Sequence, residues 1–282
     1  MFSPKNILVP TDFSELSAYA VPYAVRLAER LDGSLTLLHA DAFVEPIDLV
    51  GGGMLAHDAA RVDELRALAE ERLEEFAKAH VPRHVPVTRL TRVSSPFAAI
   101  PAVAAETGAS LIAMGTHGRS GWRRALLGSV AETVVKETIV PVLTVRHESP
   151  AGGSFSRILC PVNFSEVSRQ ALEDAWVLAV SCDAEVLVAH VVEQHVEGGE
   201  ERFRAWLPPS IEGRLEYKEL ELGSEPAHHI LEFAEAESCD LVVIGANRRR
   251  QSDTTVIGTT TESITRSATM PVLVVAHLDA ED

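Results

Sequence analysis

Apolar residues follow two patterns along this chain. Short, almost continuous apolar runs, such as Leu111–Met114 and Leu241–Ile244, are typical of strands that are buried on both faces. Between such runs apolar residues recur three or four positions apart, as they do from Leu16 to Leu31, which is the spacing of an amphipathic helix. Strands that alternate with helices favour right-handed crossovers and a parallel sheet covered on both faces.

In the first half of the chain this pattern predicts five strands and four helices. The strands are expected at residues 6–9, 35–39, 85–91, 110–114 and 142–145, and the helices at 14–31, about 57–79, 97–106 and 129–137. Pro22 lies inside the first of these helices, where it removes one backbone hydrogen bond. We therefore expect a kink at Pro22 and not a break.

The chain also contains an internal repeat. The run Ile7-Leu-Val-Pro-Thr-Asp-Phe-Ser-Glu15 returns 151 residues later as Ile158-Leu-Cys-Pro-Val-Asn-Phe-Ser-Glu166, whereas Pro141-Val-Leu-Thr-Val145 returns after 130 residues as Pro271-Val-Leu-Val-Val275. The second copy has therefore lost about 21 residues in its middle. Turn-forming residues mark a linker between Arg146 and Phe155. We expect two doubly wound domains, at residues 1–147 and 155–282.

Composition agrees with two ordinary globular domains. The 282 residues are 46% apolar and 23% charged, which excludes a mainly disordered chain. The three cysteines, Cys160, Cys182 and Cys239, have no C-x-x-C spacing, so they predict neither a zinc ribbon nor a disulfide framework. No apolar run approaches the length of a membrane span, and the start lacks the pattern of a signal peptide. We expect a cytoplasmic protein that does not bind membranes.

Charge argues against nucleic acid as a partner. The formal net charge is −16, and such a field repels phosphate backbones and anionic membrane surfaces. The charge is also unevenly divided. Residues 1–150 carry 15 basic and 18 acidic side chains, a net charge of −3, whereas residues 151–282 carry 10 and 23, a net charge of −13. A polyanionic ligand would therefore meet less repulsion in the first half.

The most informative motif lies between the fourth strand and the fourth helix of the first half. It reads Met114-Gly-Thr-His-Gly-Arg-Ser-Gly-Trp-Arg-Arg-Ala-Leu-Leu-Gly-Ser-Val130, with Gly115, Gly118 and Gly128 in the spacing G-x2-G-x9-G. Glycines let backbone amides approach a ligand, and the amino end of a helix favours phosphate. Ser129 either caps the helix or donates its hydroxyl to a phosphate. His117, Arg119, Arg123 and Arg124 add positive charge. The motif predicts a polyphosphate site.

Two further positions can complete this site. If the first strand neighbours the fourth, Asp12 faces the glycine motif, where it can bind ribose hydroxyls or a magnesium ion. The backbone of Ala40, at the end of the second strand, can bind the edge of an adenine. The alternatives are structural: Asp12 as a turn or N-cap residue, Gly115 as a turn, and Ser129 as an N-cap.

Structural roles are favoured for three other features. His39 and His190 end strands and are expected to be packed and hydrogen-bonded. The run Arg248–Arg250 is expected to be a solvated patch on a loop.

Together these motifs resemble the universal stress protein family in its tandem two-domain form, over nearly the whole chain. The resemblance implies two tandem doubly wound α/β domains, each with a five-stranded parallel sheet in the order 3-2-1-4-5. It also implies ATP in the crevice between strands one and four, and association of the domains through their last strands. The ATP contacts that it implies are Pro10, Thr11, Asp12, Ala40, Met114, Gly115, His117, Gly118, Arg119, Gly128, Ser129 and Val130.

The second copy departs from this pattern at the positions that would contact phosphate. Asn163 replaces Asp12, Asn247 replaces His117, and Arg248 replaces the second glycine of the motif, although Gly245, Gly258 and Thr259 remain. Asparagine supplies no carboxylate, and an arginine side chain would crowd the backbone. We expect the second copy to bind ATP weakly or not at all, and to act as a partner domain or to hold a different ligand.

The leading hypothesis is an ATP-binding regulatory protein of the stress response, with Mg²⁺ beside the nucleotide. ATP would order residues 116–127 and change association with a partner. No Walker lysine, nucleophile–base pair or carboxylate dyad accompanies the motif, so at most slow hydrolysis is expected. The alternatives are a slow ATPase or nucleotide-dependent enzyme of a related α/β superfamily, and a scaffold with a different ligand in its second half.

The fifth strands are candidates for the contact between the two copies. Residues 142–145 and 272–275 would otherwise leave exposed apolar edges. We expect them to pair as an intramolecular pseudo-dimer. A homodimer of such chains is a further alternative.

Overall fold

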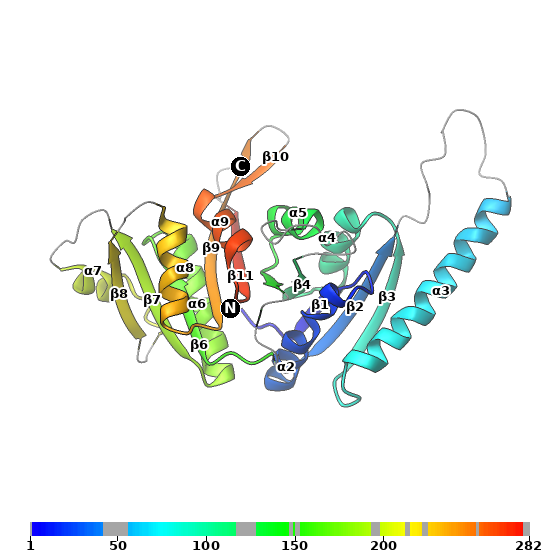
Figure 1. Cartoon of the computed structure of the whole chain (residues 1–282), viewed down its shortest axis with the longest axis horizontal. Helices are drawn as coiled ribbons and strands as arrows, with labels where there is room; N and C mark the ends of the chain where they lie inside the picture. The colour runs from blue at the N-terminus through cyan, green and yellow to red at the C-terminus, as the bar shows by residue number, and fades with distance from the viewer. Residues whose placement is uncertain are drawn as a thin grey trace.

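A single sheet of eleven strands runs through both halves of the chain (Figure 1). The computed structural model describes residues 2–41, 56–116, 128–146, 149, 153–192, 198–211, 215–221, 225–251 and 254–278. Ten strands follow the order β3-β2-β1-β4-β5-β11-β9-β6-β7-β8, and β10 pairs with β9. Within the described residues, each helix is too short or too polar to cross a membrane.

The first half has the predicted topology. Its elements are β1 (Asn6–Pro10), α1 (Glu15–Ala18), α2 (Val21–Leu31), β2 (Ser34–Asp41), α3 (Ala56–His80), β3 (Val87–Val93), α4 (Pro96–Thr107), β4 (Leu111–Gly115), α5 (Ser129–Glu137) and β5 (Val142–Val145). The five strands pair in parallel in the order β3-β2-β1-β4-β5, which confirms the expected order 3-2-1-4-5.

The second half repeats this order. Its elements are β6 (Arg157–Pro161), α6 (Glu166–Cys182), β7 (Glu185–Val192), α7 (Gly199–Trp206), β8 (Leu215–Glu221), α8 (Pro226–Ala236), β9 (Leu241–Gln251), β10 (Thr254–Ile257), α9 (Thr259–Ser267) and β11 (Val272–Leu278). Strands β8, β7, β6, β9 and β11 are neighbours in that order, all in parallel. The shortened middle of this copy is visible in its second helix, since α7 has 8 residues where α3 has 25.

The first helix of the first half is broken at Pro22, so the prediction of a kink without a break was wrong. Helix α1 ends at Ala18, and α2 begins at Val21 with Pro22 in its first turn. Proline has no N–H, so the carbonyl of Ala18 loses its helical partner, and the first turn of a helix is where proline is tolerated. Glu173 stands at this position in the second half, where α6 runs unbroken for 17 residues.

The arginine run lies in a strand, so the prediction of a loop was also wrong. Strand β9 continues through Arg248–Arg250 and pairs antiparallel with β10, with Arg248 opposite Ile257. The parallel pairing with β11 also extends to Arg248. The charge of three consecutive arginines did not reveal that β10 pairs with all three and that β11 pairs with Arg248.

The two halves join through their last strands. Strand β5 pairs antiparallel with β11, with Leu143 opposite Leu273, and the Thr144 hydroxyl donates to the Val272 carbonyl at 3.2 Å. On the helical layer above, the Arg266 guanidinium of α9 lies 3.2 Å from the Glu132 carboxylate of α5. The pairing leaves neither of these two apolar strands with an open edge.

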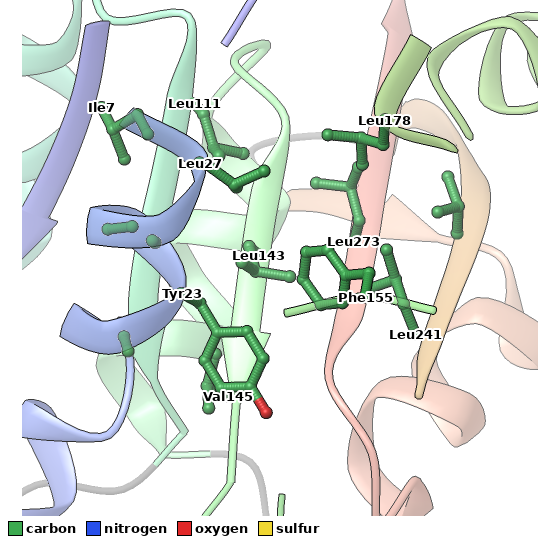
Figure 2. Packing of buried hydrophobic residues seen from close by; sticks show 14 of the residues in the cluster. Ile7, Tyr23, Leu27, Leu111, Leu143, Val145, Phe155, Leu178, Leu241 and Leu273 are labelled. Atoms are coloured by element: carbon green, nitrogen blue, oxygen red, sulfur yellow. The ribbon is translucent and has the colours of Figure 1, made fainter. Parts of the chain in front are cut away.

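An apolar cluster on one face of the sheet includes residues from both halves. Leu27 of α2, Leu143 of β5 and Leu273 of β11 belong to it, and Phe155 lies among them (Figure 2). Phe155 stacks on Tyr23 with 5.4 Å between the ring centroids. Burial raises the pKa of the Tyr23 hydroxyl to about 12. The residue just after the linker thus packs against the first half.

Candidate functional site

A cavity of about 300 Å³ lies where the carboxyl ends of β1, β2 and β4 meet the amino end of α5. Strand β1 pairs in parallel with both β2 and β4, so these ends meet at one edge of the sheet. The lining residues, which we call the first pocket, are Pro10, Thr11, Asp12, Ser17, Leu38, Ala40, Pro96, Ile100, Met114, Gly115, Thr116, Gly128, Ser129, Val130 and Ala131.

Nine of the twelve predicted contact residues line this pocket. They are Pro10, Thr11, Asp12, Ala40, Met114, Gly115, Gly128, Ser129 and Val130. His117, Gly118 and Arg119 lie outside the described residues, as do Arg123 and Arg124. Six lining residues were not predicted, and the repeat could have revealed two of them, because Ser17 and Pro96 recur as Ser168 and Pro226.

The first pocket has an apolar wall and a polar end. Leu38, Ile100 and Met114 are buried side chains on the wall. The polar end contains Asp12 and the start of α5, and Asp12 is the one charged side chain among the described lining residues. Such a division suits a ligand with a flat apolar part and a polar, charged part.

Asp12 forms a turn that its counterpart Asn163 also forms. One oxygen of Asp12 accepts the Ser14 N–H at 3.0 Å and the Ser14 hydroxyl at 2.5 Å. Asn163 accepts the same two bonds from Ser165, at 3.2 and 2.6 Å. Ser14, and not Asp12, is the N-cap of α1. The turn therefore requires a side-chain oxygen but not a negative charge.

The neighbouring Phe13 holds this turn in place. Its φ of 64° is in the left-handed region, which is uncommon for a bulky residue. The ring stacks on His39 with 4.2 Å between centroids, and the Arg72 guanidinium lies 4.5 Å from it. His39 Nδ1 lies 2.8 Å from the carbonyl oxygen of Thr11, so this nitrogen carries the proton and donates.

The two strand-end histidines have the predicted structural role. His39 is buried, and His190 makes the equivalent hydrogen bond to the Val162 carbonyl at 2.8 Å. This confirms that both rings are packed and hydrogen-bonded. His190 also lines a cavity in its own half, as described below.

The first turn of helix α5 lines the first pocket. Its N-cap is Gly128, which rules out the alternative role of Ser129 as the N-cap. Gly128 has no side chain that could cap the helix, and Gly128, Ser129, Val130 and Ala131 all line the pocket. Unpaired amides at the start of a helix carry a partial positive charge, which attracts anions.

Gly115 is glycine because α1 crosses close to the end of β4. A Cβ at this position would lie 2.4 Å from the backbone oxygen of Leu16. Gly245 is in the same situation, since its Cβ would lie 2.6 Å from Val167 Cγ1 and 2.8 Å from the Val167 oxygen. Helix packing is therefore sufficient to explain both glycines without a ligand.

Gly115→Ala is expected to lower the free energy of unfolding by about 2–3 kcal/mol, because the new methyl group overlaps backbone that cannot turn away. Urea unfolding measures the loss. Gly258→Ala is the control: a Cβ there meets no atom closer than 4.0 Å, and a poorer N-cap costs about 1 kcal/mol or less. Equal losses in the two variants would contradict the packing explanation.

The second half has a cavity of about 440 Å³ at the corresponding place. We call it the second pocket. It is lined by Pro161, Val162, Asn163, Ser165, Val167, Ser168, Ala189, His190, Val191, Pro226, Ile230, Ile244, Gly245, Asn247, Gly258, Thr259, Thr260 and Thr261. The loss of residues from the middle of this copy has not removed the cavity.

Comparison with known proteins identifies one family in both halves of the chain. The model of the universal stress protein family matches twice, at residues 4–146 and 154–276. A universal stress protein of Mycolicibacterium smegmatis is 27% identical over 286 residues, which cover 96% of each chain. One from Methanocaldococcus jannaschii is 31% identical over 142 residues, covering 50% of this chain and 82% of that protein. The crystal structure of a universal stress protein from Archaeoglobus fulgidus superposes with a TM-score of 0.68 at 24% identity, over 98% of this chain and 99% of that one.

Proposed function

Because the chain belongs to the universal stress protein family, in tandem two-domain form, we propose that its first half binds ATP in the first pocket. The supporting observation is the convergence of nine predicted residues around one cavity with an apolar wall and a helix amino end. The proposed domains are residues 1–147, which hold the nucleotide, and residues 155–282. The function is regulatory: occupancy by ATP changes association with a partner during a stress response.

The lining residues fit the parts of a nucleotide. Adenine would lie against Leu38, Ile100 and Met114, with its edge at the backbone of Ala40. The phosphates would lie at the first turn of α5, where amides and the helix dipole favour anions. Three of the predicted contacts, His117, Gly118 and Arg119, are proposed from the sequence motif alone.

Asp12 fits a magnesium ion or the ribose hydroxyls. Without a cation, a carboxylate would repel a triphosphate beside it. Mg²⁺ can bind carboxylate and phosphate oxygens at the same time. When bound, the ion would neutralise part of the phosphate charge. Asp12 is held for this role by its turn with Ser14.

We propose binding without rapid catalysis, because the glycine motif is accompanied by no Walker lysine, nucleophile–base pair or carboxylate dyad in the sequence. The three cysteines are free, which fits our proposal of a cytoplasmic protein.

The pairing of β5 with β11 fits our proposal of a pseudo-dimer of the two halves within one chain.

Asp12→Asn tests the nucleotide site. Calorimetric titration with ATP and Mg²⁺ is expected to show an affinity at least about tenfold lower than that of the wild type, equivalent to about 1.4 kcal/mol. Without Mg²⁺ the two proteins should differ much less. The fold is expected to survive, because Asn163 forms the same turn. The control is Asp32→Asn at the exposed C-cap of α2, which removes the same charge outside the pocket.

Four results would contradict this proposal or replace it with an alternative. Failure of the wild type to bind ATP at millimolar concentration would overturn it. Equal affinities of Asp12→Asn and wild type with Mg²⁺ would remove Asp12 from the site. Release of pyrophosphate that depends on a second substrate would favour an enzyme of a related superfamily, and single-turnover release of phosphate would favour a slow ATPase. Mass spectrometry of nucleotide that copurifies with the protein provides an independent test.

A further inference from the structure

An arginine, a phenylalanine and a histidine form a stack beside the turn of Asp12. The Arg72 guanidinium of α3 lies 4.5 Å from the centroid of the Phe13 ring. The His39 ring of β2 stacks on the same phenylalanine, with 4.2 Å between the ring centroids. Phe76, one turn further along α3, meets the Phe13 ring edge-on at 6.2 Å. Phe13 thus contacts two elements that are distant from it in the sequence.

The second half repeats this arrangement. The Arg202 guanidinium of α7 lies 4.4 Å from the centroid of the Phe164 ring. The rings of His190 and Trp206 have their centroids 4.6 Å and 5.4 Å from that of Phe164. Phe164 and His190 follow their counterparts by 151 residues, and Arg202 and Trp206 follow theirs by 130. The arginine, the phenylalanine and the histidine are therefore present in both copies.

The shortened second copy has kept the part of the helix that carries this arginine. Helix α7, with its 8 residues Gly199–Trp206, corresponds at the offset of 130 to residues 69–76 of α3. This segment of the 25-residue helix α3 contains both Arg72 and Phe76. The contacts with phenylalanine therefore do not depend on the length of the helix, which indicates that the stack has a role of its own.

The stack surrounds a residue whose backbone is strained. Phe13 has a φ of 64° and Phe164 a φ of 62°, in the left-handed region that bulky residues rarely adopt. Such a conformation persists only where the surrounding contacts determine it. A guanidinium over an aromatic ring and two aromatic rings in contact attract each other. These contacts therefore supply part of the free energy that holds the strained backbone.

The strained residue connects the stack with the first pocket. Phe13 lies between Asp12, which lines the pocket, and Ser14, whose N–H donates to the Asp12 carboxylate at 3.0 Å. Its ring packs against the apolar cluster that contains residues of α2 and α3. The wall of the pocket, which includes Leu38, belongs to the cluster on the opposite face of the sheet. An effect of Arg72 on the pocket therefore passes through this turn.

We propose that Arg72 is a positioning residue of the first pocket, which fixes through Phe13 the turn in which Asp12 presents its carboxylate. Arg202 has the equivalent role for Asn163 in the second half. The effect of Arg72 on nucleotide affinity rests on the proposed function, whereas its effect on the turn does not. Because Arg72 and Arg202 are both exposed, each can be replaced without a change in the buried core.

Native-state hydrogen exchange, measured by NMR, tests the effect on the turn without any ligand. Arg72→Met removes the charge and keeps an unbranched side chain. It is expected to speed exchange of the Ser14 amide at least about threefold. The Ser165 amide, which donates to Asn163, should change less than about twofold. Arg202→Met is the matched variant and should give the reverse result. Unchanged exchange of the Ser14 amide in Arg72→Met would overturn the inference.

Calorimetric titration with ATP tests the effect on the site. With Mg²⁺, Arg72→Met is expected to lower the affinity for ATP about threefold, because a less ordered carboxylate binds the ion less well. In EDTA the variant should match the wild type, and Arg202→Met should match it in both solutions. Arg72→Met should have no further effect in an Asp12→Asn background, since both changes act on the same carboxylate. Arg72→Lys keeps the cation and should recover part of the affinity.

Two results of the titration would contradict this role. A loss of ATP affinity that is equal with and without Mg²⁺, or that persists in the Asp12→Asn background, would mean that Arg72 does not act through the carboxylate. Equal losses of ATP affinity in Arg72→Met and Arg202→Met would also overturn the inference. A wild type that binds no ATP refutes the proposed function instead, and exchange of the Ser14 amide then decides by itself whether Arg72 fixes the turn.

Discussion

Phe155→Ala is expected to lower the free energy of unfolding by about 3–5 kcal/mol. Phe155 is 2% exposed and belongs to the apolar cluster that includes residues from both halves. Its ring stacks on Tyr23 in the first half and lies beside Leu273 of the second (Figure 2). Alanine removes this buried surface and leaves a cavity that the flanking strands cannot easily close.

Chemical denaturation of the full chain measures this loss. Phe97→Ala is the control, because Phe97 is 42% exposed and surface substitutions usually change stability by about 0.5 kcal/mol. A loss below about 1 kcal/mol for Phe155→Ala would mean that the cluster can repack around the missing ring. It would also show that this residue contributes little to the contact between the halves.

Asp174→Asn is expected to raise the free energy of unfolding by about 2–4 kcal/mol at pH 8. Asp174 lies in α6, is 2% exposed and accepts a hydrogen bond from Gln170 at 2.8 Å. Burial raises the pKa of its carboxyl group to about 7, the hydrogen bond from Gln170 opposes this rise, and the charge of Glu173 adds to it.

The sign of this effect follows from the raised pKa. The folded protein favours the neutral acid, so the contribution of Asp174 to stability is full below the ordinary pKa of about 4 and is lost as the pH rises to about 7. Asparagine keeps an oxygen for Gln170 and never ionises. Its advantage should therefore be large at pH 8 and small at pH 4.

Urea unfolding at both pH values tests this prediction. The control is Asp183→Asn at the exposed C-cap of α6, which makes the same chemical change in a side chain that is not buried. An Asp174→Asn variant that is equally stabilised at both pH values would contradict a raised pKa. A destabilised variant at pH 8 would show that the carboxylate has a favourable partner.

Much of the fold could be predicted from local patterns. Helix α5 and strand β5 begin and end at the predicted residues, and the repeat predicted the second domain. The two errors have different physical origins. At Pro22 the missing N–H, a local property of proline, ends the hydrogen bonding of α1. At Arg248 two neighbouring strands stabilise an extended backbone, and these contacts lie beyond the local pattern.

The polar end of the candidate site was easier to predict than its wall. Asp12, Gly128 and Ser129 stand out as polar or small residues at the ends of predicted elements. Leu38 and Ile100 resemble any other core residue in the sequence. Their place on the wall of the pocket depends on which helix packs beside which strand end.

The amino-acid sequence by itself determined the alternation of strands and helices, the two copies, and the residue types at the strand ends, because periodicity and repetition are local properties of a chain. The tertiary structure alone decided the antiparallel register of β5 with β11, the persistence of a cavity in the second half, and the burial of Asp174. It also supplied the packing reason for Gly115. Cavities, burial and strand edges depend on contacts between residues far apart in sequence, and these exist only once the elements have packed.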